Sequence, residues 1–114
     1  YFGFAKINLV YVFKELNSFE DAIKSYERAL SINPNFAEAH NNLGVAFKEL
    51  DHPNKAAYHY ERALKINPNF VDAFSNLGAI YTDLGRLKDA ESSYKKAILI
   101  DPEYAEAHNN LSVN

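Results

Sequence analysis

One phrase recurs in this chain with a fixed period, and that period limits the fold more than any other feature. AEAHNNLG occupies 37–44, VDAFSNLG occupies 71–78 and AEAHNNLS occupies 105–112. The same step separates three prolines and four leucines: Pro34, Pro68 and Pro102, and Leu9, Leu43, Leu77 and Leu111. A period of about 34 residues is typical of a repeat protein, in which one supersecondary unit is stacked several times.

Each repeat predicts two helices. In the middle repeat, Leu43 and Phe47 belong to an apolar stripe with helical spacing. Pro53 suits the first turn of a second helix, where its missing N–H is not needed. Asn67 precedes a proline, which disfavours the α conformation and ends that helix. The pattern predicts helices over 4–16, 20–32, 37–50, 53–66, 71–84, 87–100 and 105–113. The fold class is therefore all-α, with antiparallel helix hairpins stacked into a solenoid.

Small residues at fixed positions predict how the two helices of a hairpin pack. Gly44 is expected to face Ala56, and Gly78 is expected to face Ala90. Small side chains at such places would allow two helix backbones to approach closely. Large aromatic residues would fill the space beside them, because each buries a large area.

Composition excludes several classes of function. The net charge of −3 argues against a nucleic-acid partner, which would call for a basic surface. The chain has no cysteine, so disulfides, thiolate catalysis and cysteine zinc sites are excluded. No apolar run approaches the ~18 residues of a membrane span, so no membrane partner is expected. The compartment stays open, with an intracellular, cytoplasmic location favoured. The chain does not begin with Met and is expected to be a fragment of a longer protein.

The four histidines do not predict a metal site. His40 and His108 occupy equivalent packing positions two repeats apart, His52 lies in a turn, and His59 is expected to stand alone on a second helix. The sequence also lacks a Ser/His/Asp arrangement, a glycine-rich phosphate loop and an HExxH motif. We therefore expect no cofactor, no metal and no catalytic activity in this chain.

Asparagines recur with the period and are the main candidates for ligand contact. Asn8, Asn42, Asn76 and Asn110 are each separated by one full period. A carboxamide carries donors and an acceptor, so it can bond to the N–H and C=O groups of an extended peptide. The acidic neighbours Glu38, Asp72 and Glu106 would favour neutral or basic segments. By spacing, Asn41 and Asn109 are predicted to be more exposed and could also contact ligand. An equal alternative is that these asparagines bond to neighbouring helices and have a structural role.

The pattern resembles the tetratricopeptide repeat, whose signature is W-x2-L-G-x2-Y, then A-x3-F, then P, within one repeat. Two repeats carry it: His40, Leu43, Gly44, Phe47, Ala56, Tyr60 and Pro68, and then Phe74, Leu77, Gly78, Tyr81, Ala90, Tyr94 and Pro102. The first repeat departs from it, with Lys6 in place of an aromatic residue and Val10 in place of glycine. The resemblance implies a right-handed superhelical solenoid, with repeats at about 3–36, 37–70 and 71–104 and a partial repeat at 105–114.

The resemblance also implies a function. In this family the first helix of each unit lines a concave groove, so one asparagine per repeat would lie along it. The chain is expected to be a protein–protein interaction module that binds an extended peptide there. Chaperone-binding members clamp a terminal carboxylate with Lys and Arg. The corresponding positions here are Ile7, Tyr11, Asn42, Asp72 and Asn76, so that use is not expected.

Two alternatives remain open. The sequence of the repeats resembles that of the nucleocytoplasmic O-linked GlcNAc and fucose transferases. This resemblance implies that the chain is the substrate-selecting repeat domain of such an enzyme, with the catalytic site in a separate domain. The chain could instead be a self-associating scaffold. In that case the apolar side of the 105–113 helix, with Ala107 and Leu111, would pair chains into a homo-oligomer.

Overall fold

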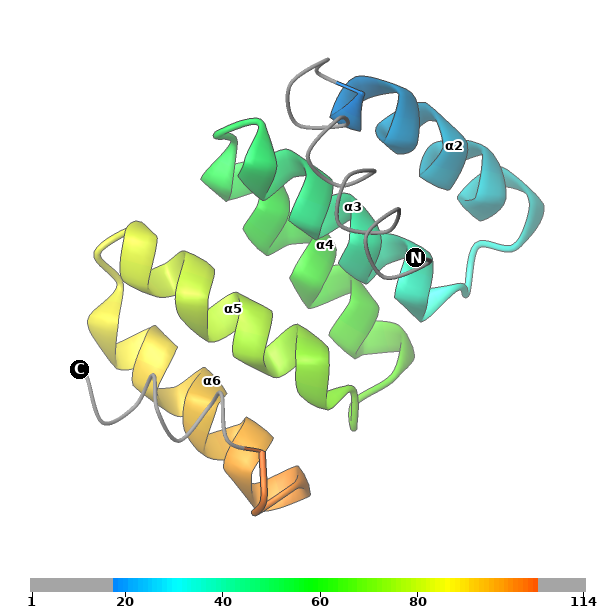
Figure 1. Ribbon diagram of the computed structural model, residues 1–114. Coiled ribbons are helices and arrows are strands. Elements are labelled where there is room, and N and C mark those ends of the chain that lie inside the picture. The colour runs from blue at the N-terminus through cyan, green and yellow to red at the C-terminus, as the bar shows by residue number, and fades with distance from the viewer. Residues whose placement is uncertain (1–17, 105–114) are drawn as a thin grey trace, which may run out of the picture.

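The computed structural model describes residues 18–104, and α-helices form most of this part of the chain (Figure 1). They are α2 (Phe19–Ile32), α3 (Ala37–Glu49), α4 (Pro53–Ile66), α5 (Val71–Asp83) and α6 (Leu87–Ile100). Each begins and ends within one residue of its predicted bounds. The all-α fold class is thereby confirmed. The helices predicted over 4–16 and 105–113 lie outside the described residues.

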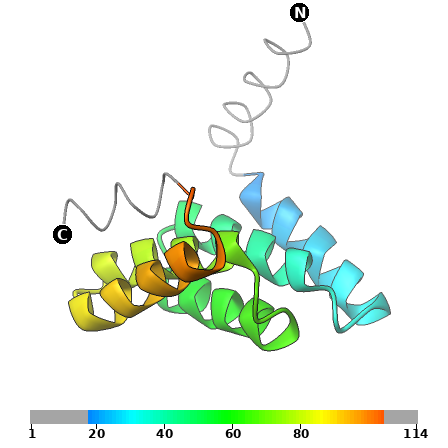
Figure 2. The same ribbon diagram turned by 90° about the horizontal axis from the view of Figure 1, so that it is seen from below.

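The helices stack as successive hairpins. The helices α3 and α4 form one hairpin and α5 and α6 form the next, while α2 packs on α3 and α4 packs on α5. The first helices of the two hairpins, α3 and α5, also touch each other directly. Figure 2 shows the same stack from below, with α2 near one end and α6 near the other. This arrangement brings equivalent side chains of successive repeats next to one another on a shared face.

A glycine and a tyrosine set the separation of the two helices in each hairpin. A methyl group added to Gly44 would lie 2.6 Å from Cδ1 of Tyr60, and one added to Gly78 would lie 2.6 Å from Cε1 of Tyr94. Both rings are buried, at 1% and 2% exposure. In each hairpin the three atoms nearest to such a methyl group belong to the tyrosine four residues after the expected alanine. The glycine makes room for an aromatic ring.

The two hairpin turns share one backbone geometry although their sequences differ. Asp51 has φ of 66° and its equivalent Gly85 has φ of 77°. In each turn the N–H group of the next residue returns to a carbonyl five residues earlier, from His52 to Phe47 and from Arg86 to Tyr81, both at 2.8 Å. A left-handed residue followed by such a bond is the Schellman ending of a helix, which satisfies carbonyls that have no partner within the helix.

Candidate functional site

One polar surface runs along α3 and α5, and we call it the α3–α5 face. On α3 it consists of Glu38, Asn42, Val45 and Glu49, all of which are exposed. On α5 the equivalent residues are Asp72, Asn76, Ala79 and Asp83, which are exposed or half-buried. Elsewhere on α3, Leu43 and Ala46 are buried.

The asparagines of this face have unequal surroundings. The Nδ2 group of Asn76 donates a hydrogen bond of 3.0 Å to Oδ1 of Asn41, which joins α5 to α3. Asn41 is only 8% exposed, so the prediction that it is one of the more exposed asparagines is wrong. Adjacent residues on a helix point about 100° apart, and α5 covers the side of α3 on which Asn41 lies. For Asn41 and Asn76 the structure therefore favours the structural role.

Asn42, the other asparagine of the α3–α5 face, lies open to solvent. It is exposed, and its carboxamide forms no hydrogen bond with any residue between 18 and 104. Both its donors and its acceptor are thus available to a ligand. The remaining predicted site residues, Asn8, Glu106, Asn109 and Asn110, lie outside the described part of the chain.

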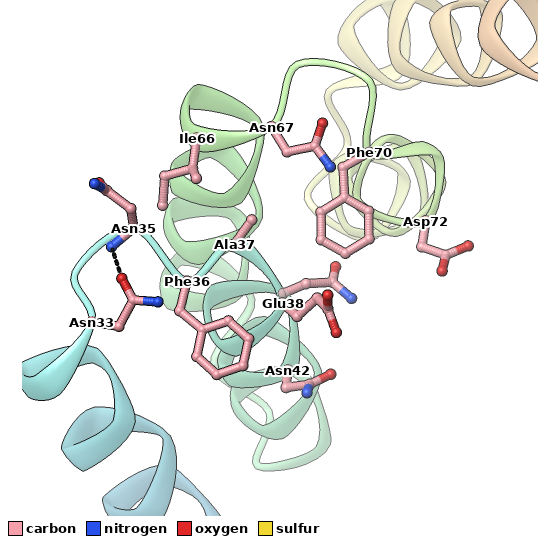
Figure 3. A pocket seen from close by; sticks show the side chains of 11 residues that line it. Asn33, Asn35, Phe36, Ala37, Glu38, Asn42, Ile66, Asn67, Phe70 and Asp72 are labelled. Carbon is pink, nitrogen blue, oxygen red and sulfur yellow. Dashed lines mark hydrogen bonds between the residues drawn. The ribbon is translucent and has the colours of Figure 1, made fainter.

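A cleft of about 520 Å³ opens beside Asn42 (Figure 3). It lies where the turns before α3 and α5 meet the first turns of those helices. Its described lining consists of Asn33, Asn35, Phe36, Ala37, Glu38, Asn41, Asn42, Ile66, Asn67, Phe70 and Asp72. The cleft thus contains four of the predicted site residues: Glu38, Asn41, Asn42 and Asp72. Its size is within the range of small-ligand pockets.

The two turns that border the cleft are built in the same way. The side-chain oxygen of Asn33 accepts a hydrogen bond from the backbone N–H of Asn35 at 3.2 Å, and Asn67 and Asn69 repeat this bond at 3.1 Å. An asparagine that bonds to the backbone two residues later fixes a tight turn. Sequence reasoning used Asn67-Pro68 only as a helix ending and missed the cleft. The repeated phrase NPNF at 33–36 and 67–70 was the available signal.

The charge of the cleft is negative. Glu38 and Asp72 lie in the first turns of α3 and α5, and none of the described lining residues is basic. The hydroxyl of Tyr104 donates a hydrogen bond of 2.9 Å to Oδ1 of Asp72, which leaves the other carboxylate oxygen open. Within residues 18–104, neither carboxylate belongs to an ion pair.

A histidine pair lies on the packed side of α3 and α4. The Nδ1 atoms of His40 and His59 are 3.1 Å apart, so one ring donates and the other accepts. The prediction that His59 stands alone is therefore wrong, because facing helices bring it against His40. Burial, helped by the positive charge of Arg62, lowers the pKa of both rings, that of His59 to about 4. No cluster of three or more possible metal ligands occurs in the described residues.

A second polar contact joins neighbouring hairpins through Tyr81. Its hydroxyl donates a short hydrogen bond to the carboxylate of Glu61 on α4. The guanidinium of Arg86 lies 4.3 Å from the centre of the Tyr81 ring and pairs with Asp89 at 2.9 Å. Burial and then the bond to Glu61 raise the pKa of the Tyr81 hydroxyl to about 12. Glu61 thus takes part in a bond between repeats.

Family models match most of the chain. A tetratricopeptide repeat model matches residues 37–70 and again 71–104, and a second model described as a TPR repeat matches 11–51. The chain belongs to the tetratricopeptide repeat family. No helix of this tetratricopeptide repeat chain within residues 18–104 has both the length and the apolar character that a membrane span requires. No curated protein sequence matches it.

Solved structures share the fold. The second TPR domain of human RPAP3, in complex with the HSP70 peptide SGPTIEEVD, is 24% identical; the match covers 89% of this chain and 84% of that domain, with a TM-score of 0.81. The first TPR of Spaghetti (RPAP3), bound to the HSP90 peptide SRMEEVD, is 23% identical. That match covers 89% of this chain and 80% of the other, with a TM-score of 0.83. MamA is 28% identical over 89% of this chain and 59% of its own, with a TM-score of 0.81.

Proposed function

We propose that this chain is an interaction module that binds an extended segment of a partner protein on the α3–α5 face. The observation that carries the proposal is the free carboxamide of Asn42 beside a preformed cleft. An extended segment presents N–H and C=O groups in alternation, and a carboxamide can bond to both. Val45, at 37% exposure, supplies apolar contact next to it.

Membership of the tetratricopeptide repeat family and the peptide complexes of two similar domains support this function. Both of those peptides carry several carboxylates. On this chain, Asn42, Asp72 and Asn76 carry no positive charge, and Asp72 would repel an anionic peptide end. We therefore propose that the chain selects neutral or basic segments rather than acidic tails.

The test is binding of the 114-residue chain to an array of dodecapeptides, with Asn42→Ala as the variant and SRMEEVD as an added probe. Wild type should retain a subset of the array peptides and ignore SRMEEVD. Loss of one well-placed hydrogen bond should weaken the retained peptides about tenfold in the variant. Retention of no array peptide, or equal binding by both proteins, would overturn the proposal.

Two alternatives have separate tests. The transferase hypothesis rests on the AEAHNNLG wording, and a nucleotide-sugar domain encoded in the same gene would support it. The scaffold hypothesis predicts self-association, which sedimentation at high protein concentration would detect. The proposal itself assigns no reaction and no cofactor to this chain.

A further inference from the structure

The cleft beside Asn42 combines two aromatic rings with unpaired negative charge. Phe36 and Phe70 are the residues directly before α3 and α5. Their backbone N–H groups donate hydrogen bonds to the carbonyls of Asn33 and Asn67, both at 3.2 Å. In the view of Figure 3 the side chain of Glu38 lies between the two rings. The walls of the cleft are thus placed by two copies of one turn, which fixes them before any ligand arrives.

Unpaired carboxylates beside aromatic rings match one kind of side chain. Lysine and arginine have apolar stems that pack on rings and charged ends that seek carboxylates. A cation is also attracted to the face of an aromatic ring within about 6 Å of its centre. The molecule already uses this contact elsewhere, at Lys55 over Phe47 and Lys96 over Phe74. Phe36 and Phe70 have no such cation among the described residues.

The carboxylates also have a structural use, because a first-turn acid stabilises the helix N-terminus. That use does not account for the cleft. Glu20 occupies the same first-turn position on α2, yet no described residue from the first turn of α2 lines the cleft. An acid in a helix first turn therefore does not by itself produce such a cleft. The Tyr104 hydroxyl also holds Asp72 in place while leaving one oxygen open.

We propose that this cleft binds one lysine or arginine side chain of the partner segment held on the α3–α5 face. The inference rests on the proposed function and adds to it a residue preference at one position of the bound segment. The basic end would lie between Glu38 and Asp72, with its stem against Phe36 and Phe70. The carboxamide of Asn42 would hold the adjacent backbone.

The experiment uses a positional dodecapeptide library and three forms of the 114-residue chain. These are the wild type, the double variant Glu38→Gln with Asp72→Asn, and a control, Glu20→Gln with Glu27→Gln. Both doubles remove two exposed carboxylates, so they match in net charge. The cleft variant takes both from helix first turns, and the control takes one from a first turn and one from the middle of α2. The amide introduced at position 72 still accepts the Tyr104 hydroxyl, and circular dichroism checks that each form is folded.

Wild type and control should select Lys or Arg at one position of the bound peptides. Replacing that residue with citrulline or norleucine should weaken binding about threefold to tenfold, a loss typical of partly exposed charge and cation–aromatic contacts. In the cleft variant this loss should disappear, while peptides with norleucine bind as they do to wild type. A fourth form, Phe36→Leu, should reduce the preference about twofold.

The outcomes separate the two proposals. Selection of peptides without a basic position, or a preference that survives in the cleft variant, would overturn the cleft inference and leave the groove function standing. If the control loses the preference to the same extent, net charge alone explains the preference, and the cleft inference is overturned as well. Retention of no peptide by wild type would overturn both.

Discussion

The repeats at 37–70 and 71–104 share one backbone geometry but differ in the side-chain contacts that they form. Both place glycine against tyrosine in the hairpin, and both put a left-handed residue at the hairpin turn. Beside this shared frame, the first has His40 and His59 in contact. The second has Phe74 and Ser93 at those positions. The small residues and the tyrosine therefore define the hairpin, while the neighbouring aromatic positions can vary.

The aromatic residue in each first helix shows the same freedom. Phe47 stacks on His59, with ring centres 5.4 Å apart and planes 10° from parallel. Its equivalent Tyr81 instead reaches Glu61 of the preceding hairpin. Phe47 therefore packs within its own hairpin, whereas Tyr81 forms a polar contact that joins two repeats. Substitutions that exchange or remove these features test how far the repeats are equivalent.

The largest effect is expected from Gly44→Ala and from Gly78→Ala. A methyl group at either site would overlap a buried tyrosine ring, so each variant should lose about 1–3 kcal/mol of unfolding free energy. At an exposed position within a helix, the same change normally raises the unfolding free energy by up to about 1 kcal/mol. Urea unfolding followed by circular dichroism measures both. If only one variant is destabilised, the two hairpins do not share the packing described above.

The histidine pair should make the first of these repeats sensitive to acid. The folded pKa of His59, about 4, lies below the ordinary value of 6.5, so the unfolded chain binds more protons between these values. Stability should therefore fall as pH decreases from 6.5 to 4. Allowing for solvent screening of the partly exposed ring, we expect a loss of about 1 kcal/mol of unfolding free energy.

Thermal melts from pH 7.5 to 4 measure this loss. The matched variant is His40→Phe with His59→Ser, which copies the residues of the next repeat. It should melt with a flatter dependence on pH than wild type. An equal slope in both proteins would show that other groups cause the acid sensitivity.

The smallest effect is expected at the hairpin turns. Asp51 adopts a left-handed conformation that its equivalent Gly85 adopts without strain. Asp51→Gly should therefore stabilise the chain by about 0.5–1 kcal/mol, and Gly85→Ala should destabilise it by a similar amount. Urea midpoints of both variants give the comparison. A loss of stability on Asp51→Gly would show that the aspartate side chain has a favourable role in this turn.

The helices could be predicted from the sequence because their signals are local. Period, apolar spacing and the prolines placed all five described helices within one residue. Side-chain surroundings were harder, because they depend on how neighbouring helices rotate against each other. Asn41 and Asn42 are adjacent in sequence, yet α5 covers one and leaves the other exposed.

The candidate site was predicted in part. Glu38, Asn42 and Asp72 do line a common surface, since a repeat of fixed length brings equivalent positions together. The contribution of Phe36 and Phe70 was missed, because the turns that carry them were interpreted only as helix boundaries. A turn between repeats contributes to a surface when two copies of it lie side by side, as they do here.

The most direct test of the account compares Asn42→Ala with Asn76→Ala, using unfolding free energy and the Kd for the tightest array peptide. We predict that Asn42→Ala weakens binding about tenfold and leaves stability within ~0.5 kcal/mol. Asn76→Ala should cost about 1 kcal/mol of stability, because the buried Asn41 loses its partner. The opposite pattern, with stability lost at Asn42 and binding unchanged, would contradict the assignment of the ligand contact to Asn42.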